Sequence, residues 1–194
     1  MGTSKRRLLD EALAGRKWSA GSELNEFFKE VWSQNQGDNL TFLCIGTDRS
    51  SGDALGPLVG SKLIKYGFRH VIGSLDHPCD SLNFKDRLEA IPQNHQIVAI
   101  DACLGTAPSV GHYILARQPL LPAQSVGGML PPVGDYSVAA IVNVKGPKPY
   151  TSLQMTSLYQ VMCMAEEIAT AAASAFGKIP NLATKHGSEP AVLD

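Results

Sequence analysis

Cysteine is scarce in this chain of 194 residues, and the cysteines that are present form no motif. The four of them, Cys44, Cys79, Cys103 and Cys163, lie far apart without any Cys-x-x-Cys pair. Disulfide frameworks and cysteine-rich zinc sites both need recurring short spacings, so we expect neither. Cys44 and Cys103 stand inside apolar runs, which is typical of small buried hydrophobes in a reducing compartment.

The sequence also lacks an excess of either charge. It has 17 basic and 18 acidic residues, a formal net charge of -1, and no basic stripe with interleaved aromatics. Proteins that bind nucleic acids usually carry such a stripe, so we expect no nucleic-acid partner. Neither G-x-G-x-x-G nor G-x-x-x-x-G-K-[ST] occurs, which disfavours a nucleotide site.

Long apolar runs are missing as well. The amino terminus has no apolar stretch long enough for a signal peptide, and Arg6 stands where a myristoylation pattern needs Ser or Thr. The most membrane-like segment, 153–176, contains Gln154, Gln160, Glu166 and Glu167, which would be costly in lipid. We therefore expect a cytoplasmic protein with no membrane partner.

What the sequence does contain is an alternation of strand and helix patterns. Strands are expected at 39–45, 70–75, 96–103, 111–116 and 136–144, and helices at 19–35, 55–66, 80–91 and 152–176. Alternation of this kind predicts an α/β fold, with a mostly parallel sheet between two layers of helices. We divide the chain into a segment 1–38 with an amphipathic helix packed on the core, a domain 39–176 and a loose tail 177–194.

Two acids stand where strand-to-helix loops of such a sheet gather. The stretch GTDRSSGDALGP, residues 46–57, follows the first strand and contains Asp48 and Asp53, and Asp101 stands near the carboxyl end of the strand QIVAIDAC, residues 96–103. Ligands collect beyond the carboxyl ends of parallel strands, so Asp53 and Asp101 are candidates for a shared site. The alternatives are an N-cap role for Asp53, and a turn or helix-cap role for Asp101.

Three stretches together resemble a known family. "CIGTDRSSGDALGPLVG", "AIDACLG" and "VGDYSVAAIVN" are similar to the YyaC family of sporulation proteins, described as spore proteases, and the resemblance covers 39–176. "GDALGP" and "AIDAC" are also similar to the acid-bearing motifs of the spore germination protease, an aspartate-dependent endopeptidase. The resemblance implies the phosphorylase/hydrolase-like α/β sandwich of the hydrogenase maturation proteases, and a place in the spore or forespore interior.

Carried over to this chain, the resemblance places catalytic aspartates at Asp53 and Asp101 and implies a protein or peptide substrate. The hydrogenase proteases instead suggest that these acids and a histidine hold nickel. The corresponding stretch here, LPPVGDYSV, has Asp135 and no histidine, so we expect no cofactor. His77 or His112 would have to substitute under the alternative of a nickel or zinc site.

Two carboxylates close together repel, so their protons bind with unequal affinity and the pair can share one proton. The ionised acid would deprotonate a water that attacks a peptide carbonyl, and the protonated acid would supply a proton. Either acid can take either role on the sequence alone. Supporting residues are expected to be Gly46, Asp48, Arg49, Gly52, Gly56 and Asp135.

Our first hypothesis is an endopeptidase that acts on a protein during sporulation or germination. The second is a metal-dependent maturation-type peptidase, and the third is a non-enzymatic interaction module with the same fold. The loop 118–134 is either a flap over the site or an ordinary connection. The segment 1–38 is either a cover over the site or simply part of the core.

Overall fold

The computed structural model describes residues 18–35, 39–122 and 130–179. The first 17 residues, most of the predicted tail 177–194 and part of the predicted flap 118–134 lie outside these ranges.

Five strands of the described residues form one sheet in the order β2-β1-β3-β5-β4. The strands are β1 (Leu40–Cys44), β2 (Val71–Ile72), β3 (Gln96–Gly105), β4 (Tyr113–Ala116) and β5 (Tyr136–Val144). All neighbouring pairs are parallel except β4 with β5, which is antiparallel. The predicted mostly parallel sheet is therefore confirmed, with an antiparallel strand at one edge.

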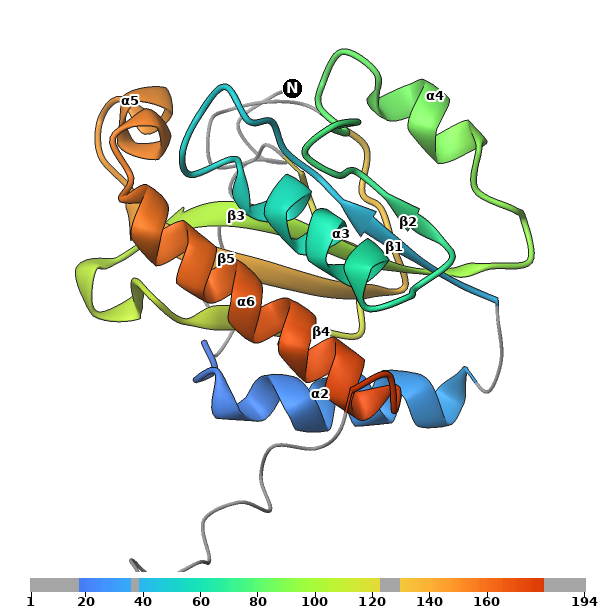
Figure 1. Ribbon diagram of the computed structural model, residues 1–194. Helices are drawn as coiled ribbons and strands as arrows, with labels where there is room; N and C mark the ends of the chain where they lie inside the picture. The colour runs from blue at the N-terminus through green and yellow to red at the C-terminus, as the bar shows by residue number, and fades with distance from the viewer. Residues whose placement is uncertain (1–17, 36–38, 123–129, 180–194) are drawn as a thin grey trace, which may run out of the picture.

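Helices pack against this sheet, and the longer ones lie over the same face (Figure 1). They are α2 (Ser22–Gln34), α3 (Leu55–Lys65), α4 (Phe84–Glu89), the short 3-10 helix η1 (Ala107–Ser109), α5 (Pro149–Gln154) and α6 (Leu158–Ala175). Residues of α2, α3 and α6 bury a large apolar cluster with one side of β1, β3 and β5. Phe84 of α4 joins a smaller cluster on the other side, with Leu120 and Val133. These layers confirm the predicted α/β sandwich.

The two faces follow from the alternation of side chains along β1 and β3. Phe42 and Ile100 point into the large cluster, whereas Leu43 and Ala99 point into the smaller one. Burial on both faces explains why the two strands read as continuous apolar runs in the sequence.

The chain reverses its direction of travel across the sheet between β1 and β3. The crossover through α3 carries it from β1 to β2 on one side, and the crossover through α4 returns it to β3 on the other side of β1. In open parallel sheets, ligands bind beyond the carboxyl ends of the two strands at which the connections run in opposite directions, which here are β1 and β3. The fold thus singles out one place on the sheet edge for a site.

Several predicted elements have different lengths in the structure. The predicted helix 152–176 is divided into α5 and α6, and Ser157 begins the second helix by accepting a hydrogen bond from the Gln160 backbone N–H at 3.4 Å. The predicted helix 80–91 shortens to α4, and the predicted strand 70–75 shortens to β2. The ends of these helices and strands depend on local hydrogen bonds, which cannot be inferred from the spacing of apolar residues.

The amino-terminal helix α2 contributes to the main core. Its buried side chains, Leu24, Phe27, Phe28 and Val31, belong to the same cluster as Ile168 of α6. Trp32, on the same helix, is 40% exposed, and the centroid of its ring lies 4.9 Å from that of the Phe176 ring. Most of the apolar face of α2 is therefore used in packing.

We predict that Gly56→Ala destabilises the protein strongly, because a Cβ atom at residue 56 would lie 2.0 Å from the carbonyl oxygen of Ile45. Overpacking against backbone costs about 1–3 kcal/mol, and urea unfolding should show a loss in the upper part of that interval. Gly146→Ala is the control, since its Cβ would meet only the Ser152 hydroxyl at 3.1 Å. Equal unfolding free energies for the two variants would contradict the close contact.

Candidate functional site

The candidate site lies at the carboxyl end of β1, between β2 and β3. There the Ile45 N–H donates to the Ile100 carbonyl at 2.8 Å, and the Gly46 N–H donates to the Cys79 carbonyl at 2.8 Å. The loop that follows β1 therefore starts from a backbone anchored on both sides. The positions of both candidate acids derive from this anchor.

Asp101 lies on β3 directly after Ile100, the residue that pairs with Cys44 at the end of β1. Its side chain is only 8% exposed, and its Oδ1 accepts a hydrogen bond from the Ala102 N–H at 2.8 Å. β3 continues to Gly105, so Asp101 is level with the end of β1 and not, as predicted, at the end of its own strand. The helix-cap alternative for Asp101 is wrong, because no helix begins there.

Asp53 lies on the loop after β1, close to the start of α3. Its backbone carbonyl accepts the Thr47 N–H at 3.1 Å, and a Cβ atom on Gly46 would lie 2.0 Å from that carbonyl oxygen. Gly46 also has a φ of +145°, which side chains disfavour, so glycine is needed here on both counts. The N-cap alternative for Asp53 is wrong, because Ala54 occupies the cap position of α3 and no side chain caps the helix.

The electrostatic surroundings of the two acids differ. Burial raises the pKa of Asp53, and the neighbouring Ser50 hydroxyl opposes that shift without reaching hydrogen-bond geometry. Two cysteine thiols lie near enough to Asp101 for its charge to affect their pKa values. The pKa of Cys103 is raised to about 12, mainly by burial and secondly by the charge of Asp101. The pKa of Cys79 is raised to about 11, again mainly by burial. The charge of Arg87 opposes this rise, and the charges of Asp80 and Asp101 add to it. Both thiols therefore stay protonated near neutral pH.

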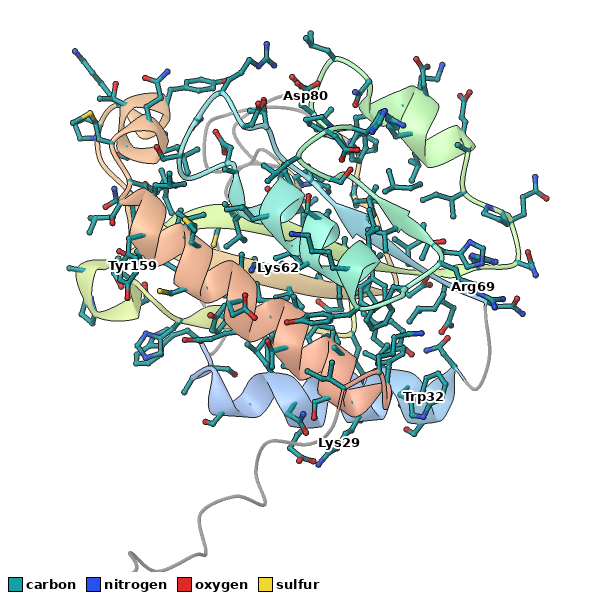
Figure 2. All side chains as sticks on the ribbon, viewed as in Figure 1. Lys29, Trp32, Lys62, Arg69, Asp80 and Tyr159 are labelled. Atoms are coloured by element: carbon teal, nitrogen blue, oxygen red, sulfur yellow. The ribbon has the colours of Figure 1, made fainter. Side chains whose placement is uncertain are left out.

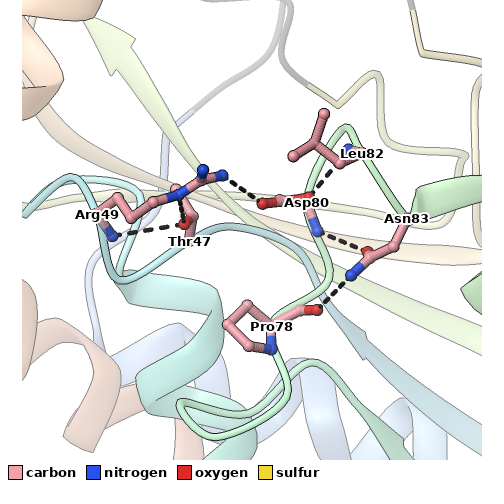
Figure 3. Close-up of polar contacts among 6 residues, drawn as sticks. All are labelled: Thr47, Arg49, Pro78, Asp80, Leu82 and Asn83. Carbon is pink, nitrogen blue, oxygen red and sulfur yellow. Dashed lines mark hydrogen bonds and ion pairs between the residues drawn. The ribbon is translucent and has the colours of Figure 1, made fainter.

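Arg49 closes one side of the site by joining two loops (Figure 3). Its Nη2 lies 2.6 Å from Oδ2 of Asp80, and its Nε donates to Thr47 Oγ1 at 3.1 Å. The helix predicted at 80–91 does not begin at Asp80, whose Oδ1 accepts the Leu82 N–H at 2.9 Å and shapes the loop after β2. Arg49 thus ties the loops after β1 and β2 together.

The opposite side of the site is formed by α5. The Gly52 N–H donates to the Leu153 carbonyl at 3.0 Å, and a Cβ atom on Gly52 would lie 2.9 Å from that residue. Gly52 therefore allows α5 to lie against the loop that carries Asp53, as Gly56 allows α3 to lie against β1. Asp48, the third predicted acid, is exposed on this loop.

Three predicted residues lie elsewhere. Asp135 is placed at the amino end of β5, where its Oδ2 accepts the Ile97 N–H at 2.8 Å, four residues before Asp101 on β3. That spacing is about 13 Å along a strand, so Asp135 does not line the site with the two acids. His77 is exposed beside Asp76, and His112 packs against Trp18.

A metal centre has no support among the described residues, where no group of three His, Cys, Asp or Glu side chains is placed to hold an ion. Among the same residues, no helix is both long enough and apolar enough to cross a membrane.

Comparisons with known proteins place most of the chain in one family. The profile of the family described as "Protein of unknown function (DUF1256)" matches residues 15–171. The protein named "Uncharacterized protein YyaC" of Bacillus subtilis (strain 168) is 40% identical over 156 residues, which cover 78% of this chain and 76% of that protein. The crystal structure of a [NiFe] hydrogenase maturation protease, HycI from Thermococcus kodakarensis KOD1, is similar with a TM-score of 0.47 and 19% identity, covering 74% of this chain and 97% of that one.

We predict that Asp53→Asn stabilises the protein at neutral pH. The raised pKa means that the folded state favours the protonated acid, so stability present below the unfolded-state pKa of about 3.9 is lost as the pH rises through the folded-state value. The gain in unfolding free energy over the parent chain should therefore shrink as the pH falls from about 8 to 4. Urea unfolding across this interval, with Asp48→Asn as the exposed control, measures it; a gain that does not vary with pH would contradict it.

A second prediction concerns the two roles of Asp80. Asp80→Ala should cost more stability than Arg49→Ala, because only the first also removes the acceptor for Leu82. The coupling between Arg49 and Asp80 in a double-mutant cycle should stay below about 1 kcal/mol, since the arginine is largely exposed. Equal losses for the single variants would show that Asp80 does not hold its loop.

Proposed function

This chain belongs to the family DUF1256, and we propose that it is a peptidase that hydrolyses peptide bonds of a protein substrate with Asp53 and Asp101. The observation that carries the proposal is the presence of two aspartates, from a loop and a strand remote in sequence, beside the anchored end of β1. The family description and the relative's name state no activity. The proposed hydrolysis of peptide bonds therefore rests on the resemblance of the motifs, and the choice of Asp53 and Asp101 rests on the two acid-bearing motifs and their place in the fold.

The surroundings of the two acids fit a division of labour. Asp53, whose pKa burial raises, acts as the acid that donates a proton. Asp101, whose Oδ1 accepts the Ala102 N–H at 2.8 Å, acts as the base. This assignment chooses between the two roles that the sequence left open.

The reaction then needs only water and the two acids. Asp101 takes a proton from a water whose oxygen attacks the peptide carbonyl, and Asp53 gives its proton to the amine as the carbon–nitrogen bond breaks. The products are a carboxylic acid and an amine. A proton passed from Asp101 to Asp53 through solvent restores the starting state.

The glycines act here through packing and not as hydrogen-bond donors to substrate. The N–H groups of Gly46 and Gly52 are both used within the protein, by Cys79 and Leu153. A negative charge on the attacked carbonyl must therefore be stabilised by other groups. We propose that the protonated carboxyl group of Asp53 donates a hydrogen bond to it. The cytoplasmic location and the role in sporulation enter this proposal through the resemblance of the motifs alone.

We predict that Asp53→Asn and Asp101→Asn each abolish cleavage while the far-ultraviolet circular dichroism stays that of the parent chain. The substrate pool for the assay is a protein extract of sporulating cells, and new amino termini are identified by mass spectrometry. Asp48→Asn is the matched control and should cleave normally. Full cleavage by either site variant would refute the proposal.

The rival hypothesis of a nickel or zinc peptidase is tested on the same preparations. Metal analysis of protein purified without chelator is compared with that of Asp101→Ala. Stoichiometric metal that is lost in the variant favours the rival, because carboxylates are ligands for such ions. Protein that cleaves without bound metal favours the aspartate mechanism.

A further inference from the structure

We propose that the surface formed by α5 and the first turns of α6 docks a segment of the substrate protein that carries apolar side chains next to acidic ones. This inference rests on the proposed function and deepens it by naming the chemistry of the substrate. The surface, here called the α5–α6 patch, consists of Tyr150, Met155, Leu158, Tyr159 and Met162.

The side chains of the patch are large and apolar, but they are exposed instead of packed into the core. Met155 is 77% exposed and Tyr159 is 78% exposed, and Leu158 and Met162 are each about half exposed. Leu158, Tyr159 and Met162 lie within one turn on the same side of α6. Figure 2 shows Tyr159 near the end of α6 that adjoins α5. Methionine and tyrosine are frequent in binding surfaces, because one adapts its shape and the other combines an apolar ring with a hydroxyl.

The stretch of sequence that carries the patch has charge of one sign. No acidic residue occurs from 136 to 165, and the only basic residues in that stretch are Lys145 and Lys148. Both lysines are exposed just before α5, and neither pairs with an acidic side chain within the part of the chain that the structure describes. A partner that meets apolar side chains and two unpaired ammonium groups is best matched by apolar residues with neighbouring Asp or Glu.

The patch is continuous with the candidate site. α5 contacts the loop of Asp53 through the hydrogen bond between Gly52 and Leu153, and Lys145 donates its N–H to the Gly105 carbonyl at the end of β3. Across the site, the loop held by Asp80 presents Leu82, which is 81% exposed. A polypeptide that crosses the acids would thus meet exposed apolar side chains on both sides.

These contacts also separate docking from cleavage. The acids Asp53 and Asp101 would repel a carboxylate placed directly over them, whereas Lys145 and Lys148 attract one beside α5. The acidic residues of the substrate should therefore lie to one side of the bond that is cut. Specificity would come from the patch and chemistry from the acids.

The test uses the full chain and a random peptide library displayed on phage. Panning should enrich sequences that combine Leu, Met or Phe with Asp or Glu, and one consensus peptide is then synthesised with a fluorescent label. Fluorescence anisotropy should show at least about tenfold weaker binding for Met155→Ser with Tyr159→Ser, and for Lys145→Glu with Lys148→Glu. Because all four side chains are exposed, we expect these variants to fold, and circular dichroism verifies it.

Two controls make the outcome specific. Ile64→Ser removes an exposed apolar side chain at the far end of α3 and should leave binding unchanged. Asp53→Asn with Asp101→Asn should also keep binding, so that a failure of the proposed catalysis is distinguished from a failure of the docking surface.

Three results would overturn the inference. They are the absence of any enriched peptide, enrichment of basic peptides, and unchanged binding in both double variants. Self-association is read by sedimentation: a dimer that the Met155 and Tyr159 substitutions convert to monomer would assign the patch to a second copy of this chain.

Discussion

The candidate site depends on how closely the loop after β1 packs onto the end of that strand. Side chains at Gly46 and Gly56 would collide with the backbone of Asp53 and Ile45. If residues 46 and 56 carried side chains, α3 and the loop before it would have to move away from the sheet, and Asp53 would move with them. The absence of side chains at Gly46 and Gly56 thus helps to fix the position of Asp53, a candidate site residue.

Asp101 is held differently, because it belongs to a central strand paired on both sides. Asp101 pairs with Ala139 of β5 and directly follows Ile100, which pairs with Cys44 of β1, so it cannot shift without breaking the ladder. One acid is therefore placed by the sheet and the other by a loop packed on it. Burial raises the pKa of the loop acid, and the strand acid accepts the backbone N–H of Ala102.

The strands were predictable from sequence because burial on both faces leaves continuous apolar runs, and the alternation of elements then predicts the sheet. The expectation that Asp53 and Asp101 meet at the edge of the sheet follows from the same alternation and stays a prediction. The division between α5 and α6 was missed because Thr156 and Ser157 end and restart the helix by local hydrogen bonds, while apolar periodicity continues across them. Asp135 was misplaced because the sequence does not reveal that its carboxylate bonds to Ile97 at the opposite edge of the sheet.

The central claim is that Asp53 and Asp101 act on each other as well as on a substrate. Carboxyl-carbon NMR titration of each aspartate, in the parent chain and in the variant that replaces the other with Asn, measures this directly. If the acids share one site, removal of one negative charge lowers the pKa of the acid that remains. Titration curves that do not change in either variant would contradict a common site.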